Sequence, residues 1–155
     1  MRTPMKQTGF TLLEILVAML VLAIGLLGLA GLTTSSMRNN LSASHRTQAT
    51  WLAYDIVDRM RANRTSAVTG GYATPMGAAA NCSAAVPIGT VPVQDIAAWK
   101  NQLACALPAG NGSIAVNVNT KVATVLIQWD DSRGLVDSGN VANQAIKTFK
   151  VETQL

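Results

Sequence analysis

The hydrophobic pattern opens with a long apolar run near the start of the chain. Residues 10–32 carry one charge, Glu14, in 23 positions. A helix of that length spans roughly 34 Å, which is enough to cross the hydrocarbon core of a bilayer. The pattern therefore predicts a transmembrane or bundling helix over 10–32.

The pattern then becomes that of an amphipathic helix, which we expect to continue over 33–64. Large apolar residues recur largely every four positions and predict one buried stripe. The stripe consists of Met37, Leu41, Leu52, Ile56 and Met60. Asp55 and Arg59 stand four positions apart, a spacing that favours an ion pair on a helix. The sequence Thr-Gly-Gly at 69–71 is expected to end the helical region.

The remainder predicts a loop, a short helix and a sheet. Residues 65–111 form a connecting loop rich in small residues, with a helix over 93–107 that ends at Pro108 and Gly110. Within 112–155 the hydrophobic period becomes two, and 119–121 is expected to be a hairpin turn. The inward residues of three strands are Ile114, Val116 and Val118, then Val125, Ile127 and Trp129, then Phe149, Val151 and Leu155. The predicted fold is α+β, with an antiparallel sheet covering the long helix.

The two cysteines are Cys82 and Cys105. Two separate buried thiols and a disulfide are both compatible with the sequence. We favour the disulfide because the chain reads as exported, and because it would pin the loop onto the predicted helix. With His45 as the single histidine, the usual zinc ligand sets cannot be assembled, and we expect no metal or other cofactor.

The charge balance gives little support for a nucleic-acid partner. The net charge is +4 over 155 residues, and Arg2 and Lys6 contribute two of those charges ahead of the apolar run. Arg59, Arg61 and Arg64 crowd the end of the predicted helix, where cations complement the helix dipole. Neighbouring aspartates neutralise them locally, so we expect no nucleic-acid binding.

Three interpretations compete for the N-terminal segment. A secretory signal peptide fits the basic head, but its apolar core is shorter, usually about 7–15 residues. A plain membrane anchor fits the length but leaves Glu14 unexplained. Cleavage between Gly9 and Phe10 would place a new amine four residues before Glu14, and an ammonium group is a fitting partner for a carboxylate in apolar surroundings. Without such a partner the carboxylate costs about 2.5–3.5 kcal/mol even on lenient insertion scales.

The segment GFTLLEILVAMLVLAIGLLGLAGL resembles the class III signal of type IV pilins and pseudopilins. Gly9, Phe10, Thr11, Leu12 and Glu14 each match that pattern. The continuation RNNLSASHRTQATWLAYDIVDRMRANR resembles minor pilins of the PilV type. In detail the resemblance covers 10–64, and the C-terminal domain agrees in outline.

The resemblance implies a processing and assembly route. Residues 1–9 would be a leader that a prepilin peptidase removes after Gly9, and Phe10 would become N-methylated. Glu14 would pair with the Phe10 amine of an adjacent pilin. The chain would sit in the bacterial inner membrane with a periplasmic C-terminal domain and then enter a pilus. Its partners would be other minor and major pilins, the inner-membrane assembly platform and membrane lipid.

The function that this resemblance implies is that of a minor pilin, a structural subunit that helps to start pilus assembly. A type II secretion pseudopilin and a pilus-tip adhesin or DNA-binding pilin are the alternatives. We do not expect an enzyme, since the sequence shows no catalytic motif, and we expect His45 to be solvated or interfacial. The acidic stretch 130–140 lacks the spacing of a calcium loop and reads as a solvated connection.

Overall fold

The computed structural model describes residues 9, 11–78, 81–82, 85, 87–132 and 145–155. Its longest element is α1, Leu12–Ala62, a helix of 51 residues. The chain divides into two compact units, Met1–Met37 and Arg38–Leu155, and α1 contributes to both.

In the first unit the described residues are almost entirely the apolar part of α1. No proline interrupts this segment and the side chains are exposed throughout, from Leu12 to Leu32. The helix is long and apolar enough to cross a membrane. The predicted membrane or bundling helix is therefore present as a continuous helix.

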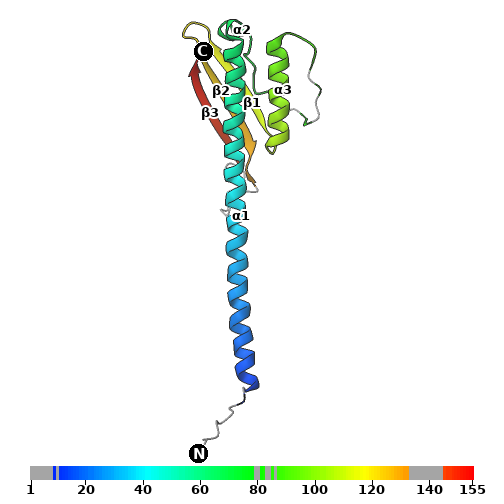
Figure 1. Cartoon of the computed structure of the whole chain (residues 1–155), viewed down its shortest axis with the longest axis vertical. Helices are drawn as coiled ribbons and strands as arrows, with labels where there is room; N and C mark the ends of the chain where they lie inside the picture. The colour runs from blue at the N-terminus through cyan, green and yellow to red at the C-terminus, as the bar shows by residue number, and fades with distance from the viewer. Residues whose placement is uncertain (1–8, 10, 79–80, 83–84, 86, 133–144) are drawn as a thin grey trace, which may run out of the picture. The chain divides into compact units, whose positions relative to one another are not determined.

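The second unit pairs helices with a sheet, as the α+β prediction expected. After the end of α1 come α2, Arg64–Val68, and α3, Val91–Ala106. The strands are β1, Asn111–Asn117, β2, Val122–Asp130, and β3, Ile146–Gln154. They form an antiparallel sheet in the order β1-β2-β3. In Figure 1 the upper part of α1 crosses this sheet, and α3 lies beside β1.

Alternation along β2 directs one set of side chains into the core. Val125 and Ile127 are fully buried and Trp129 nearly so, as their period of two predicted. Opposite them on β3 stand Val151 and Phe149, which pack against the same core. The inward faces predicted for these two strands are confirmed.

The buried face of α1 differs from the predicted stripe. Ile56 and Met60 are buried as expected, but Met37 is 72% exposed and Leu41 is 40% exposed. The helix instead presents Ala49 and Ala53, both fully buried, to the core. Small side chains bring the helix backbone close to large residues from the sheet, and a search for large apolar residues overlooks such positions.

The turns fall close to the predicted places. Thr69 caps α2, and Gly70 follows with φ of 86°, a conformation that glycine adopts without strain. The β1–β2 hairpin is held by Asn117, whose side-chain oxygen accepts hydrogen bonds from the backbone N–H groups of Asn119 and Thr120. Val118, which we expected on the strand, lies in this turn because β1 ends at Asn117.

Cys82 and Cys105 are joined by a disulfide, with their Cα atoms 4.5 Å apart. Cys105 lies in the last turn of α3, so the bridge ties the preceding loop to that helix. The predicted pairing is present.

Replacing both cysteines by serine should lower the free energy of unfolding by about 3 kcal/mol, because the 23-residue separation is no longer closed in the unfolded chain. Urea unfolding of the full chain in detergent micelles measures this difference. A reductant should lower the stability of the natural chain by a similar amount and leave the double variant unchanged. Equal midpoints for the two oxidised proteins would show that the bridge contributes no stability.

Candidate functional site

The first turn of α1 carries the chemistry of the N-terminal segment. The Oγ1 atom of Thr11 accepts a hydrogen bond from the backbone N–H of Glu14 at 3.3 Å. The backbone oxygen of Thr11 also accepts from Glu14 and Ile15. Thr11 followed three residues later by Glu14 is the pattern of a capping box. This signal is local and is present in the sequence itself as the spacing of Thr11 and Glu14.

The capping arrangement gives Glu14 a local role. A carboxylate in the first turn interacts favourably with the positive end of the helix dipole. Among the described residues, no cation pairs with this carboxylate. Glu14 is therefore placed well for helix initiation while its charge stays available to a partner.

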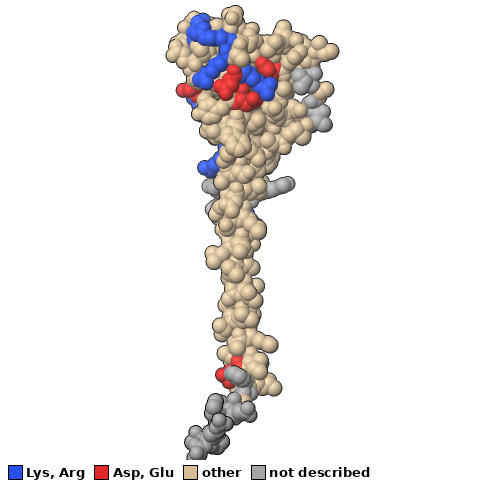
Figure 2. Space-filling model, viewed as in Figure 1, with Lys and Arg blue, Asp and Glu red and all other residues tan. Residues whose placement is uncertain are grey.

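An open apolar groove borders Glu14 on α1. The residues lining it with Glu14 are Ile15, Ala18, Met19 and Leu22. Figure 2 shows acidic atoms near the start of the helix, followed by a long stretch without charged groups on the visible face. The only acidic group of this segment thus borders an uncovered apolar surface.

The structure describes some of the site residues predicted from the sequence and leaves Phe10 outside the described residues. Gly9 is described and exposed. Phe10 lies outside the described residues, so the predicted contact between Phe10 and Glu14 stays a prediction. Only the cysteine pair among the predicted sites is brought together by the fold.

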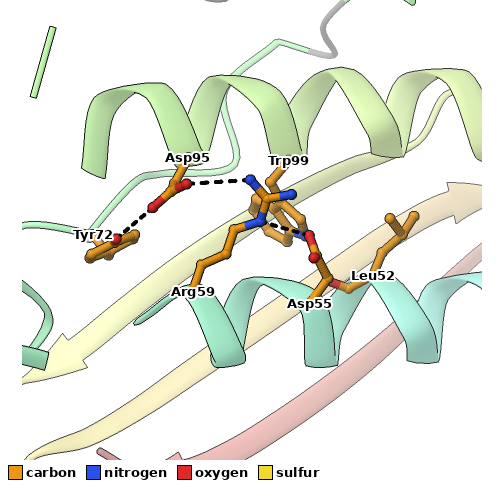
Figure 3. A network of polar contacts seen from close by, with 6 residues as sticks. All are labelled: Leu52, Asp55, Arg59, Tyr72, Asp95 and Trp99. Atoms are coloured by element: carbon orange, nitrogen blue, oxygen red, sulfur yellow. Dashed lines mark hydrogen bonds and ion pairs between the residues drawn. The ribbon is translucent and has the colours of Figure 1, made fainter. Parts of the chain in front are cut away.

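A polar network in the second unit joins α1, α3 and the segment between them (Figure 3). The Nε atom of Arg59 lies 2.9 Å from a carboxylate oxygen of Asp55, and its Nη1 atom lies 3.3 Å from one of Asp95. The Tyr72 hydroxyl donates to the other oxygen of Asp95 at 2.7 Å. Burial lowers the pKa of Arg59, but contact with Asp55 and Asp95 outweighs it and raises that pKa. The network therefore fixes α3 against α1.

Tyr72 makes this network sensitive to alkaline pH. Burial, and then the hydrogen bond to Asp95, raise the pKa of Tyr72 from 10.0 to about 12. A raised pKa favours the neutral phenol in the fold, so its stabilisation is complete below pH 10 and is lost as pH rises towards 12. We expect Tyr72→Phe to be less stable at neutral pH, by about 1 kcal/mol, but to lose less stability between pH 10 and 12.

Denaturant unfolding of the full chain at several pH values measures this effect. Tyr54→Phe is the matched control because Tyr54 is exposed, and it should keep the pH dependence of the natural chain. Parallel stability curves for Tyr72→Phe and the natural chain across the alkaline range would contradict the prediction.

A second polar cluster was missed by sequence reasoning. Asp131, which follows β2, is 2% exposed and accepts a hydrogen bond from the Ser42 hydroxyl at 2.6 Å. Its other oxygen lies 3.5 Å from Nδ1 of His45. His45 is 7% exposed and packs inside its own domain. The expectation of a solvated or interfacial histidine is therefore wrong. Because the paired residues lie far apart in the sequence, no local pattern predicts the pairing.

The three arginines near the end of α1 each have a partner within the domain. Beside the contacts of Arg59, Arg61 binds Asp58 and the hydroxyl of Thr153. Arg64 donates to the backbone oxygen of Leu155 at 2.9 Å. Arg61 and Arg64 therefore tie this helix end to β3 and the residue after it, and Arg59 ties it to α3. These contacts account for the clustering of the three arginines.

Comparison with known proteins bears on the N-terminal segment alone. Residues 4–30 match the family model for the prokaryotic N-terminal methylation motif. No curated protein and no solved structure matches the chain. The matched motif is a type IV pilin-like prepilin signal, so it supports the resemblance to the type IV pilin superfamily. It is typical of structural proteins, and with the long apolar helix it fits membrane anchoring.

Proposed function

We propose that this chain is a minor pilin, a structural subunit that helps to initiate a type IV pilus, and that it resembles the PilV type. The observation that carries the proposal is the coincidence of two features. Residues 4–30 match the methylation motif, and from Leu12 on this segment lies in an exposed apolar helix that bears one acidic group, Glu14.

The proposed mechanism uses that acid as a docking group. A prepilin peptidase removes residues 1–9, and the exposed amine of Phe10 is methylated. In the assembled fibre the amine of one subunit neutralises Glu14 of its neighbour. A buried charge that has a partner at one offset only fixes the register of the two helices, because any other offset leaves both charges unpaired in apolar surroundings.

Apolar contact between helices supplies the remaining attraction. Gly25, Gly28 and Gly31 lie along this part of α1, and a Cβ atom added at any of them would meet nothing within 4 Å. Small residues let neighbouring helices approach closely. The glycines therefore leave room for a neighbouring pilin helix.

These contacts are consistent with the following proposed route of the subunit. Before assembly, α1 anchors the chain in the inner membrane, with the second unit on the periplasmic side. Helix docking against other minor and major pilins at the inner-membrane assembly platform then moves it from lipid into the fibre. The exposed apolar surface of α1 is covered first by lipid and then, in the fibre, by partner helices.

N-terminal mass analysis of the mature chain tests the proposal directly. The expected first residue is methylated Phe10. Gly9→Val should block processing and leave the leader attached, which provides the control. A working filament whose subunits retain residues 1–9 would overturn the mechanism. Co-purification with secretion components in place of pilus components would instead identify a type II secretion pseudopilin.

A further inference from the structure

A groove in the second unit lies between α1 and the strands β2 and β3. Its volume is about 350 Å³. The residues that line it are Arg46 and Thr50 from α1, Trp129 from β2, and Lys147, Thr148 and Phe149 from β3. All of these residues belong to the same compact unit.

The strand register explains how a cation reaches this groove. Lys147 stands directly opposite Trp129, and Phe149 stands opposite Ile127. Directly opposite residues share one face of a sheet, so Lys147 is on the face that packs against α1. Arg46 follows the buried His45 on the helix and is itself exposed.

Neither cation has an anionic partner among the described residues. The ion pairs of this part of the chain involve other side chains. The nearby carboxylate of Asp131 is already bound by Ser42 and His45. Arg46 and Lys147 thus flank the same groove, and no carboxylate of the described residues pairs with either of them.

The floor of the groove contains a second unsatisfied group. Trp129 is 3% exposed, and its indole N–H finds no acceptor in the described part of the chain. Buried donors in folded proteins almost always have a partner. Beside two cations that have no anionic partner among the described residues, this donor points to an acceptor that the described residues do not supply.

We propose that this groove binds a carboxylate carried on a single saccharide ring, with uronic acids as the ligand class. Arg46 and Lys147 hold the carboxylate through charge-assisted hydrogen bonds. Half-buried Phe149 gives an apolar wall for the ring, and an oxygen of the ligand accepts from the Trp129 indole. The volume lies near the lower end of the range for ligand pockets, roughly 300–1,000 Å³, which favours one ring. This site is independent of helix docking.

A competing explanation concerns Lys147 alone. Inward-pointing charges on edge strands prevent sheets from pairing edge to edge, and β3 is an edge strand of the described sheet. Preventing edge-to-edge pairing needs a charge of either sign at this position. Ligand binding needs a positive one, so Lys147→Glu separates the two explanations.

The test follows the three indole N–H resonances in nuclear magnetic resonance spectra of the full chain in non-ionic detergent. Trp51→Phe and Trp129→Phe assign the signals. Glucuronate should shift the Trp129 resonance and leave that of Trp99, which already donates to Leu52, in place. Glucose is the matched ring without a carboxylate and should cause no shift. Phosphate binding as tightly as glucuronate would overturn the saccharide assignment.

Variants complete the test. Lys147→Glu and Arg46→Gln should each weaken glucuronate binding by about tenfold or more, as loss of a charged contact does. Lys150→Glu and Arg38→Gln, on the same strand and helix but outside the groove lining, should bind like the natural chain. Absence of any glucuronate-induced shift, or equal affinity for Lys147→Glu and the natural chain, would refute the site.

Discussion

Glu14→Val should leave the chain inserted in the membrane but reduce its co-assembly with partner pilins by about two orders of magnitude. The valine removes a costly charge from the apolar segment, so insertion becomes easier. In the fibre it leaves the Phe10 amine of the neighbour without an anion. Breaking a buried pair by removing one partner costs about 3–5 kcal/mol, which corresponds to at least a hundredfold change in affinity.

Glu14→Gln separates docking from helix capping. Thr11 and Glu14 form a capping-box pattern, and glutamine serves at the second position of that box as well as glutamate. If Glu14 acts only in helix initiation, the glutamine variant should assemble normally. If it acts by charge, the glutamine variant should fail much as the valine variant does.

The measurement is recovery of each variant with partner pilins after crosslinking in cells, normalised to its amount in the membrane fraction. Glu152→Gln is a control for the loss of an acidic charge, because Glu152 is exposed on β3 in the second unit and pairs with Lys150. That variant should co-assemble like the natural chain. Normal recovery of both Glu14 variants would refute the docking mechanism.

Local periodicity predicted α3 and the three strands well because each of them buries a single face. It missed α2, which lies largely in the stretch expected to be a loop. Along β2 the large inward residues alternate strictly, so one buried set was possible. Along α1 the same reasoning was wrong at Met37 and Leu41, because burial depends on where the sheet lies and not on residue size. Ala49 and Ala53 occupy the buried face, and small residues give no strong signal in a search for large apolar side chains.

The candidate sites divide in the same way. The N-terminal motif is defined by the order of residues in one short segment, so the sequence alone was enough to predict it. The groove beside Trp129 brings Arg46 together with Lys147 across about a hundred residues, and the Asp131 cluster likewise depends on the fold. The groove depends on the register of β2 with β3, and the Asp131 cluster depends on where α1 passes the end of β2. Periodicity leaves both open.

Trp99→Ala should produce the largest loss of stability among single changes in the second unit. Trp99 on α3 is fully buried, and its indole N–H donates to the backbone oxygen of Leu52 on α1 at 2.9 Å (Figure 3). Truncating a buried tryptophan costs about 3–5 kcal/mol through lost burial and the cavity that remains. The lost donor leaves the Leu52 oxygen without this partner and adds about 1 kcal/mol.

Trp51→Ala provides the matched control, since Trp51 lies on α1 but is 69% exposed. Its removal should change the unfolding free energy by no more than about 0.5 kcal/mol. Denaturant unfolding of both variants as full chains, followed by circular dichroism, compares them directly. The disulfide keeps α3 tied to the preceding loop in either variant, so a difference reports the loss of the Trp99 side chain from the core, including its contact with α1. Similar midpoints for the two alanine variants would mean that Trp99 does not hold the helices together.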